Sequence, residues 1–293
     1  MSTAANPLHA SCYADNACHE TVTIVENVQV ARDTFRARFE CPAIAERITP
    51  GQFLMVRLAN LNDPILGRPF AMYDVIHNDA GNRSAVDVVY LVGGKMTTRF
   101  REFRPGQKLE VWGPLGNGFM VEPDRDLIMV AGGIGQTPFL ALGKEALGKQ
   151  QYGDRSVATV EARSVKMCYG ARNAEYFAGV DDFRAAGVDL RLSTDDGSTG
   201  HHGLVTDLLS IAIDESESTP QVVCCGPEPM MEAVANLTAE RGVPCNVSLE
   251  TPMACGIGIC FTCVAKVLDE SGEWDYKRTC VEGPVFDAKK IAW

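Results

Sequence analysis

The chain has 293 residues, of which 46% are hydrophobic and 22% are charged, a composition that is ordinary for a globular protein of two or three domains. Its 27 basic and 38 acidic residues leave a formal charge of −11, which argues against nucleic acid or an anionic membrane surface as a partner. No apolar run approaches the roughly 20 residues that a membrane-spanning helix needs, so we expect no membrane span.

The first segment, residues 1–19, is polar and rich in small side chains. It lacks the basic start and apolar stretch of a secretory signal, so we expect a flexible tail and a cytoplasmic protein. Disulfides are rare in that reducing compartment. The 11 cysteines, an odd number, are therefore expected to be free thiols or metal ligands.

Six short β-rich runs lie between residues 20 and 115, separated by Gly, Pro and Asn. They are TVTIVENVQV, TFRARF, QFLMVRL, FAMYDVI, VDVVYLV and KLEVWG. This spacing predicts an antiparallel barrel or sandwich. One helix is expected within it, at 97–102.

From residue 126 onward, strand-like and helix-like runs alternate. The expected strands are DLIMVAGG, VKMCYGA, VDLRLST, QVVCCG and CNVSLE, and the expected helices are TPFLALGKEALGK, EYFAGVDDFRAAG, GLVTDLLSIA and PMMEAVANLTAERG. Such alternation predicts a parallel, doubly wound sheet, with CNVSLE at its end. Residues 154–164 interrupt the pattern and are expected to be a surface excursion.

Two glycine-rich turns follow predicted strands of this sheet. Gly132, Gly133 and Gly135 lie in VAGGIGQTPFLAL, just before Thr137, and Cys225, Gly226 and Pro227 form a second turn. A turn between a strand and a helix can bind a phosphate at the helix N-terminus, although the first turn alone could equally be structural. Two such strand ends together predict a nucleotide crevice.

Two further sets of polar residues could contact a nucleotide. Asp195 and Asp196 follow another strand and could accept hydrogen bonds from ribose hydroxyls, which favours NAD over NADP, but a solvated turn explains them equally well. Arg68, together with a helix start near Thr97, could hold a pyrophosphate. A surface arginine on a strand is the commoner case.

The last segment, residues 251–293, is too small to hold a large core and contains four clustered cysteines, Cys255, Cys260, Cys263 and Cys280. The spacing C-x4-C-x2-C followed by a distant cysteine is typical of plant-type [2Fe–2S] ligands. Structural zinc sites tend to pair their cysteines in two short knuckles. A cluster is therefore favoured, while zinc and incidental thiols remain alternatives.

The order of RPFA, GGKMTTRF, GPLGNGF, AGGIGQTPF and CGPEPMM resembles the ferredoxin–NADP reductase superfamily. The tail, ETPMACGIGICFTCVAK followed by RTCVEGPVF, resembles the electron-transfer subunits of two-subunit, NAD-dependent dihydroorotate dehydrogenases. The resemblance implies an antiparallel FAD-binding β-barrel at 20–121, a Rossmann-like parallel α/β NAD domain at 122–248 and a small [2Fe–2S] domain at 249–293.

The resemblance also implies roles for individual residues. The four cysteines match the cluster ligands, and the two glycine turns match the NAD site. Ala71 stands where relatives usually have serine, and Met96 stands where they usually have glycine. The residues implied to contact FAD are Arg68, Pro69, Phe70, Ala71, Val89, Tyr90, Leu91, Met96 and Thr97.

The implied function is electron transfer in de novo pyrimidine biosynthesis. A hydride carries two electrons and a [2Fe–2S] cluster accepts one, so a flavin is needed between them, and no catalytic acid, base or nucleophile is expected. The implied partner is an FMN-containing catalytic subunit in a two-plus-two heterotetramer. The alternatives are a reductase subunit of another redox complex, such as a hydrogenase, and a zinc-stabilised nucleotide-binding module.

Overall fold

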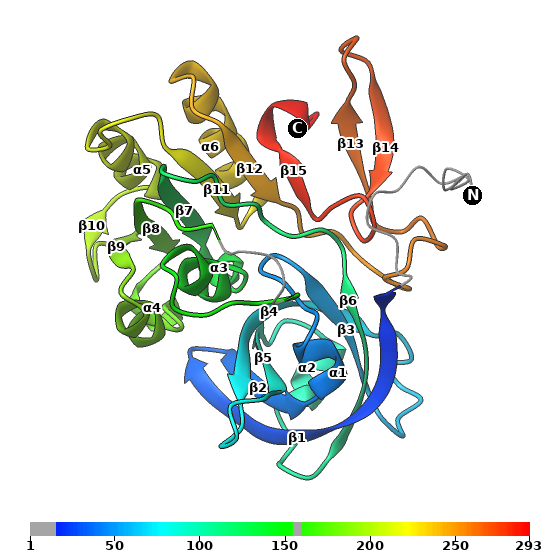
Figure 1. Ribbon diagram of the computed structural model, residues 1–293. Coiled ribbons are helices and arrows are strands. Elements are labelled where there is room, and N and C mark those ends of the chain that lie inside the picture. Colours follow the sequence, from blue (N-terminus) through cyan, green and yellow to red (C-terminus); the bar gives the residue numbers. More distant parts are fainter. Residues whose placement is uncertain (1–15, 155–159) are drawn as a thin grey trace.

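The computed structural model describes residues 16–154 and 160–293. Most of the predicted tail and residues 155–159 of the predicted excursion lie outside these ranges. The first strand begins at Cys18, two residues inside the predicted tail. Figure 1 shows the barrel below, the α/β sheet to the upper left and a small hairpin to the upper right.

The first strands close into an antiparallel barrel in the order β1-β2-β5-β4-β3-β6, which confirms the barrel and excludes the sandwich. Alternation along the strands explains its core, since Ala37 and Phe39 are fully buried while Arg36 and Arg38 between them are partly exposed. The elements are β1 (Cys18–Ala31), β2 (Thr34–Glu40), α1 (Pro42–Ala45), β3 (Phe53–Leu58), β4 (Arg68–His77), β5 (Arg83–Leu91), α2 (Lys95–Phe100) and β6 (Lys108–Leu115).

The second sheet has seven strands in the order β10-β9-β8-β7-β11-β12-β15. The pairings from β10 to β12 are all parallel, as the alternation predicted. Its strands are β7 (Asp126–Gly132), β8 (Ser164–Ala171), β9 (Asp189–Thr194), β10 (His201–His202), β11 (Gln221–Cys225), β12 (Cys245–Ser248) and β15 (Val285–Asp287).

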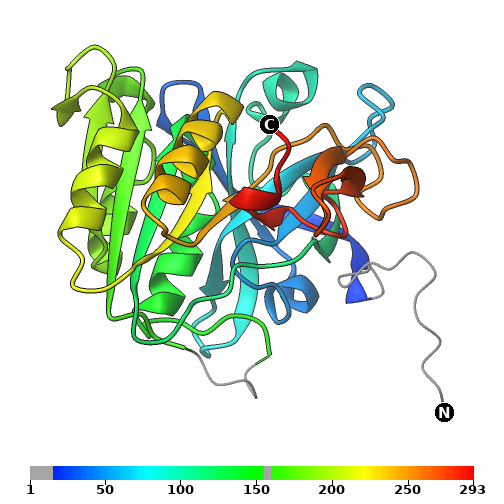
Figure 2. The same cartoon turned by 90° about the horizontal axis from the view of Figure 1, so that it is seen from above.

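Helices cover both faces of this sheet. On one face α5 packs beside α6, and on the other α3 packs beside α4 (Figures 1 and 2). The helix predicted over EYFAGVDDFRAAG is broken, because Gly179 has a left-handed φ of 75° between two helical pieces. The elements are η2 (Gly133–Gln136), α3 (Phe139–Ala146), η3 (Ala174–Tyr176), α4 (Val180–Ala186), α5 (Val205–Asp214), α6 (Glu228–Glu240) and η4 (Ala288–Lys290).

The C-terminal segment is shared between the two larger bodies. The prediction that CNVSLE ends the sheet was wrong, because β15 adds antiparallel to β12 beyond it. The remaining strands of the segment, β13 (Val264–Leu268) and β14 (Trp274–Arg278), form the separate hairpin. On the other side, Cys263 and Cys280 pack against Phe53 and Met55 of the barrel. The segment is too small for a core of its own, and its apolar side chains therefore pack into the cores of the barrel and of the α/β sheet.

Buried polar contacts join the barrel to the α/β sheet. The Asp74 carboxylate of β4 binds Lys144 at 2.5 Å and the Tyr152 hydroxyl at 2.7 Å. Next to it, the Tyr73 hydroxyl donates to Asp182 of α4 at 2.7 Å. These contacts fix the two bodies against each other and so define the crevice between them. Among the described residues, no helix is long and apolar enough to cross a membrane.

Candidate cofactor sites

Two connected cavities lie where the barrel, the α/β sheet and the C-terminal segment meet. The larger has a volume of about 1290 Å³ and runs across the carboxyl ends of the parallel strands. The smaller, of about 440 Å³, lies between the barrel and the sheet. Residues that line both cavities mark their junction. They are Leu91, Ile134, Leu249, Glu250 and Thr251.

The smaller cavity collects most of the residues expected to contact FAD. Pro69, Phe70 and Ala71 come from β4, and Val89, Tyr90 and Leu91 come from β5. Thr137 and Cys225, from the two predicted nucleotide turns, complete the opposite wall. Ala71 presents only a methyl group to this space, so hydroxyl groups near a bound flavin come from other elements.

Three of the expected FAD contacts lie outside both cavities. The Arg68 guanidinium donates to the carbonyl oxygens of Leu66 and Gly67, at 3.1 and 2.9 Å. The Thr97 hydroxyl accepts from the N–H of Gly94 and stabilises the start of α2, while Met96 is buried in the barrel core. An extended dinucleotide could still reach the Arg68 and Thr97 region, and these assignments remain predictions.

The larger cavity collects the expected NAD contacts. Gly132 and Gly133 line it from the first turn, Gly226 and Pro227 from the second, and Asp195 from the end of β9. The two turns meet directly at the strand ends, as predicted for a nucleotide crevice.

Gly135 does not line either cavity, but it permits this meeting of the turns. A Cβ at Gly135 would lie 2.3 Å from the Cys225 carbonyl oxygen, a distance that no side chain tolerates. The glycine is therefore needed for close approach between the two turns rather than for contact with a phosphate.

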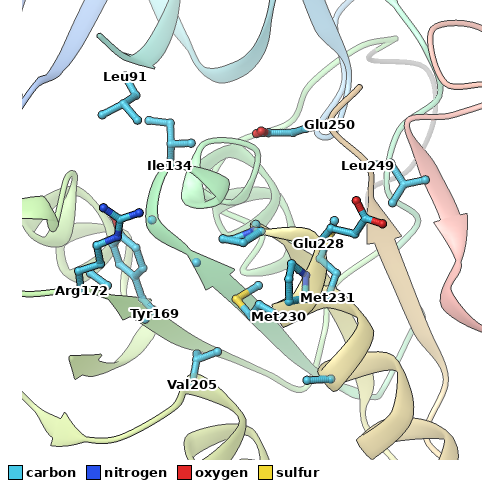
Figure 3. A pocket seen from close by; sticks show the side chains of 18 of the residues that line it. Leu91, Ile134, Tyr169, Arg172, Val205, Glu228, Met230, Met231, Leu249 and Glu250 are labelled. Atoms are coloured by element: carbon cyan, nitrogen blue, oxygen red, sulfur yellow. The ribbon is translucent and has the colours of Figure 1, made fainter. Parts of the chain in front are cut away.

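One end of the larger cavity is polar. Figure 3 shows Arg172 and Tyr169 facing the cavity from the end of β8. Asp195 lies on the neighbouring strand end, and its neighbour Asp196 accepts from the Ser198 N–H at 2.9 Å, as in a solvated turn. Asp195 and Arg172 therefore place an acceptor and a cation at this end of the cavity. The sequence reasoning missed Arg172.

Glu250 occupies the junction of the cavities and points toward Ile134 in Figure 3. Its side chain is exposed to the cavities, but the surrounding walls desolvate the carboxyl and raise its pKa. It follows the last parallel strand, where a nicotinamide and a flavin would meet. Its only sequence signal was its place as the last residue of the predicted strand CNVSLE.

The four predicted ligand cysteines interact as two pairs, Cys255 with Cys260 and Cys263 with Cys280. The hydrogen bond with Cys280 lowers the pKa of Cys263 to about 6 and raises that of Cys280. Desolvation raises the pKa of Cys260, but hydrogen bonds with Thr262 and Cys255 outweigh it and lower the value to about 6. Two pairs of thiols are what a cluster with two irons and four cysteines requires.

Contacts with Arg278 and with the barrel hold the loop that carries these thiols. Arg278 donates to the Gly258 carbonyl at 3.0 Å and stacks on the Phe261 ring at 5.2 Å. On the barrel side the Trp112 indole donates to the Cys255 carbonyl at 2.9 Å. A Cβ at Gly256, whose φ is +72°, would meet Met55 at 2.5 Å, so glycine is needed there.

The arrangement favours a cluster over a single zinc ion. Within residues 16–154 and 160–293, no three cysteine, histidine or acidic side chains form a preformed metal site, so the choice between a cluster and zinc depends on how the thiols pair. The cysteines of these residues are all free thiols. Four thiols in two pairs fit a [2Fe–2S] cluster, whose two irons share the ligands between them, better than a tetrahedral zinc site.

Together, a flavin-type barrel, a nucleotide-binding α/β sheet and a four-cysteine loop define an oxidoreductase of the ferredoxin reductase fold. Family models match the chain in the same order. They are an oxidoreductase FAD-binding domain at 21–119, an oxidoreductase NAD-binding domain at 129–236 and the iron–sulfur cluster binding domain of dihydroorotate dehydrogenase B at 250–292.

Curated relatives identify the family within this class of oxidoreductases. The electron transfer subunit of dihydroorotate dehydrogenase B (NAD(+)) from Desulforamulus reducens is 34% identical over 265 residues, covering 90% of this chain and 94% of the relative. The subunit of the same name from Fusobacterium nucleatum is 32% identical and covers 93% and 98%. The chain belongs to this family of electron transfer subunits.

Solved structures agree on the fold. An NADH-dependent reduced ferredoxin–NADP oxidoreductase, described for flavin-based electron bifurcation, contains a chain that is 28% identical. It superposes with a TM-score of 0.76 over 93% of this chain and 90% of that one. Phthalate dioxygenase reductase, at 19% identity and a TM-score of 0.57, shares the fold alone.

Proposed function

We propose that this chain carries electrons between NAD and the FMN of a dihydroorotate dehydrogenase catalytic subunit, through FAD and a [2Fe–2S] cluster. The observation that carries the proposal is the four-cysteine loop at 250–292, which matches the cluster domain of dihydroorotate dehydrogenase B. The curated relatives that match the whole chain are electron transfer subunits of that enzyme. The pathway served would be de novo pyrimidine biosynthesis, in the cytoplasm.

A bound flavin supplies the chemistry that couples two-electron exchange with a nicotinamide to one-electron exchange with iron. The chain's own residues position the groups. We assign FAD to residues 20–121, NAD to 122–248 and the cluster to 249–293. The shared wall at Leu249, Glu250 and Thr251 brings the nicotinamide and flavin sites together at one junction.

The partner would dock on the face that carries the cysteine loop. Ile259 and Phe261 on this loop are 65% and 61% exposed, and Ile65 and Leu66 on the β3–β4 loop are 66% and 50% exposed. Trp112 lies between the loops, since it binds Cys255 and packs against Gly67. Exposed apolar side chains beside a ligand such as Cys260 suit a contact that must exclude water.

The test is to produce this chain with and without an FMN-containing dihydroorotate dehydrogenase subunit. Alone, the chain should contain FAD, iron and sulfide, and NADH should reduce its flavin. With the subunit it should form a complex, two copies of each chain, that reduces NAD⁺ with dihydroorotate. Failure of the loaded chain to bind that subunit or to exchange electrons with its FMN would overturn the proposal.

A second candidate is a subunit of another redox complex. The relationship with the bifurcating NADH-dependent oxidoreductase, over 93% of this chain, favours it specifically. Co-purification from the native source separates the two candidates. A stable partner that lacks FMN and does not bind orotate would select the second. Metal analysis that gives zinc without iron or sulfide would instead select a zinc-stabilised nucleotide-binding module.

A further inference from the structure

We infer that Thr251 and Thr279 form a hydrogen-bonded relay that couples the flavin cavity electronically to the cysteine centre. The inference rests on the proposed function, because it assumes FAD in the smaller cavity and a cluster on the four cysteines. Thr251 lines both cavities at their junction. Thr279 is fully buried and immediately precedes Cys280.

The contacts between the two threonines and the centre form an unbroken chain. The hydroxyl oxygens of Thr251 and Thr279 lie 2.5 Å apart. The Thr279 hydroxyl donates to the Cys263 carbonyl oxygen at 3.1 Å, and the Thr279 N–H donates to the same oxygen at 2.8 Å. The relay therefore runs from the cavity wall to the backbone of one ligand and, along the chain, to the neighbouring ligand Cys280.

The single proton of each hydroxyl gives the relay a direction. Because Thr279 uses its proton for Cys263, Thr251 must donate to Thr279. Thr251 then presents only lone pairs to the cavity, where it can accept from an N–H of a bound ring. The hydroxyl that Ala71 lacks is thus supplied to the cavity by a residue connected to the cluster.

The other connection between the cavity and the centre is apolar. Met253 and Pro284 line the cavity, and Met253 packs against Cys263 and Cys280. Electron tunnelling falls more steeply across van der Waals gaps than along covalent and hydrogen-bonded atoms. The covalent route from Met253 through Ala254 to Cys255 crosses more bonds than the route through the two hydroxyls to Cys263, so the threonine relay is the better path. With both cofactors bound, each transfer would take one electron from the reduced flavin and reduce one ferric iron to ferrous, while both hydroxyls keep their protons.

The test compares Thr279→Val with Thr279→Ser in the holoprotein. Valine keeps the shape and the N–H bond to Cys263 but removes the hydroxyl, whereas serine restores it. We measure cluster content, the electron paramagnetic resonance spectrum, the reduction potential of the cluster and the rate of its reduction after NADH reduces the flavin. We expect valine to slow cluster reduction several-fold at an unchanged potential, and serine to restore the rate.

Thr251→Val provides the second variant, because the Thr251 side chain contacts no cysteine. This variant should keep its full cluster content and show the same slowing of cluster reduction, even if Thr279→Val loses iron. A wild-type rate in Thr251→Val, a serine variant as slow as valine, or slowing fully explained by a shifted potential would overturn the relay. Failure of the proposed function would appear separately, as wild-type protein without flavin or without iron.

Discussion

At the scale of single residues, Glu250 provides a test of the junction between the cavities. Desolvation by the cavity walls raises its pKa, so the folded protein binds this proton more tightly than the unfolded chain does. The carboxyl therefore costs no stability below its ordinary pKa of about 4.3. Its cost grows as the pH rises from that value toward the raised one and is constant above it.

We predict that the stability of Glu250→Gln relative to wild type increases as the pH rises above about 4.3, the ordinary pKa of a glutamate, and then levels off once the folded protein has lost this proton. Denaturant unfolding without added nucleotide measures the difference. Glu217→Gln, whose side chain is 86% exposed on the outer surface, controls for the loss of one negative charge. A difference that stays constant, or that widens as the pH falls, would contradict the prediction.

The cysteine centre provides a second test at the residue scale. Cys263→Ser removes one of the paired thiols, so we expect loss of the cluster and of electron transfer to the partner. NADH should still reduce the bound FAD, because that step does not pass through iron. Iron and sulfide analysis with stopped-flow absorbance measures both.

Cys18→Ser is the matched control for this variant, because Cys18 lies on β1 outside the four-cysteine loop. It should retain iron and sulfide. If Cys263→Ser keeps its cluster, the ligand assignment fails. If its FAD remains bound but NADH no longer reduces it, the proposed order of electron transfer fails.

At the scale of elements, the nucleotide crevice depends on contact between the turns after β7 and β11. Gly135→Ala places a methyl group 2.3 Å from the Cys225 carbonyl. We expect the turns to separate, with a loss of about 1–3 kcal/mol of stability, as in other overpacked sites, and weaker NADH binding. Denaturant unfolding and NADH titration measure the two effects.

Gly93→Ala is the control, because a Cβ at Gly93 would meet nothing within 4 Å. It should change neither stability nor NADH binding appreciably. If Gly135→Ala binds NADH as well as wild type does, the turns can separate without altering the crevice, and the close approach has no role in binding.

At the scale of the whole molecule, one face joins the cysteine loop to the β3–β4 loop. We predict that the double substitution Ile65→Ser and Leu66→Ser weakens binding of the catalytic subunit about tenfold or more, as expected for apolar contacts at the centre of an interface. The cluster spectrum should not change, since neither residue belongs to the cysteine loop. Titration calorimetry measures the affinity.

Ile211→Ser on α5, also an exposed apolar residue at 46%, serves as the control and should bind normally. If the Ile65→Ser, Leu66→Ser double variant binds the catalytic subunit as tightly as wild type does, the docking face lies elsewhere.

Local chemistry in the sequence accounts for much of the architecture. The six barrel strands were predictable because alternating burial has a period of two residues, and the parallel sheet was predictable because strands and helices alternate. The iron–sulfur cluster was predictable because the cysteine spacing that indicates it is local apart from Cys280. The broken helix at Gly179 was missed because a single left-handed glycine interrupts an otherwise helical pattern.

Contacts between distant segments were decided only by the tertiary structure. The three-residue strand β15 pairs with β12, more than 35 residues earlier, and is too short to show a period. Thr251 contacts Thr279, Trp112 contacts Cys255 and Glu250 lines the smaller cavity only because the C-terminal segment packs between two cores. The sequence by itself determined which cofactor motifs the chain carries, since each motif is written in neighbouring residues. The fold decided how the sites connect, because that depends on long-range packing that no local pattern encodes.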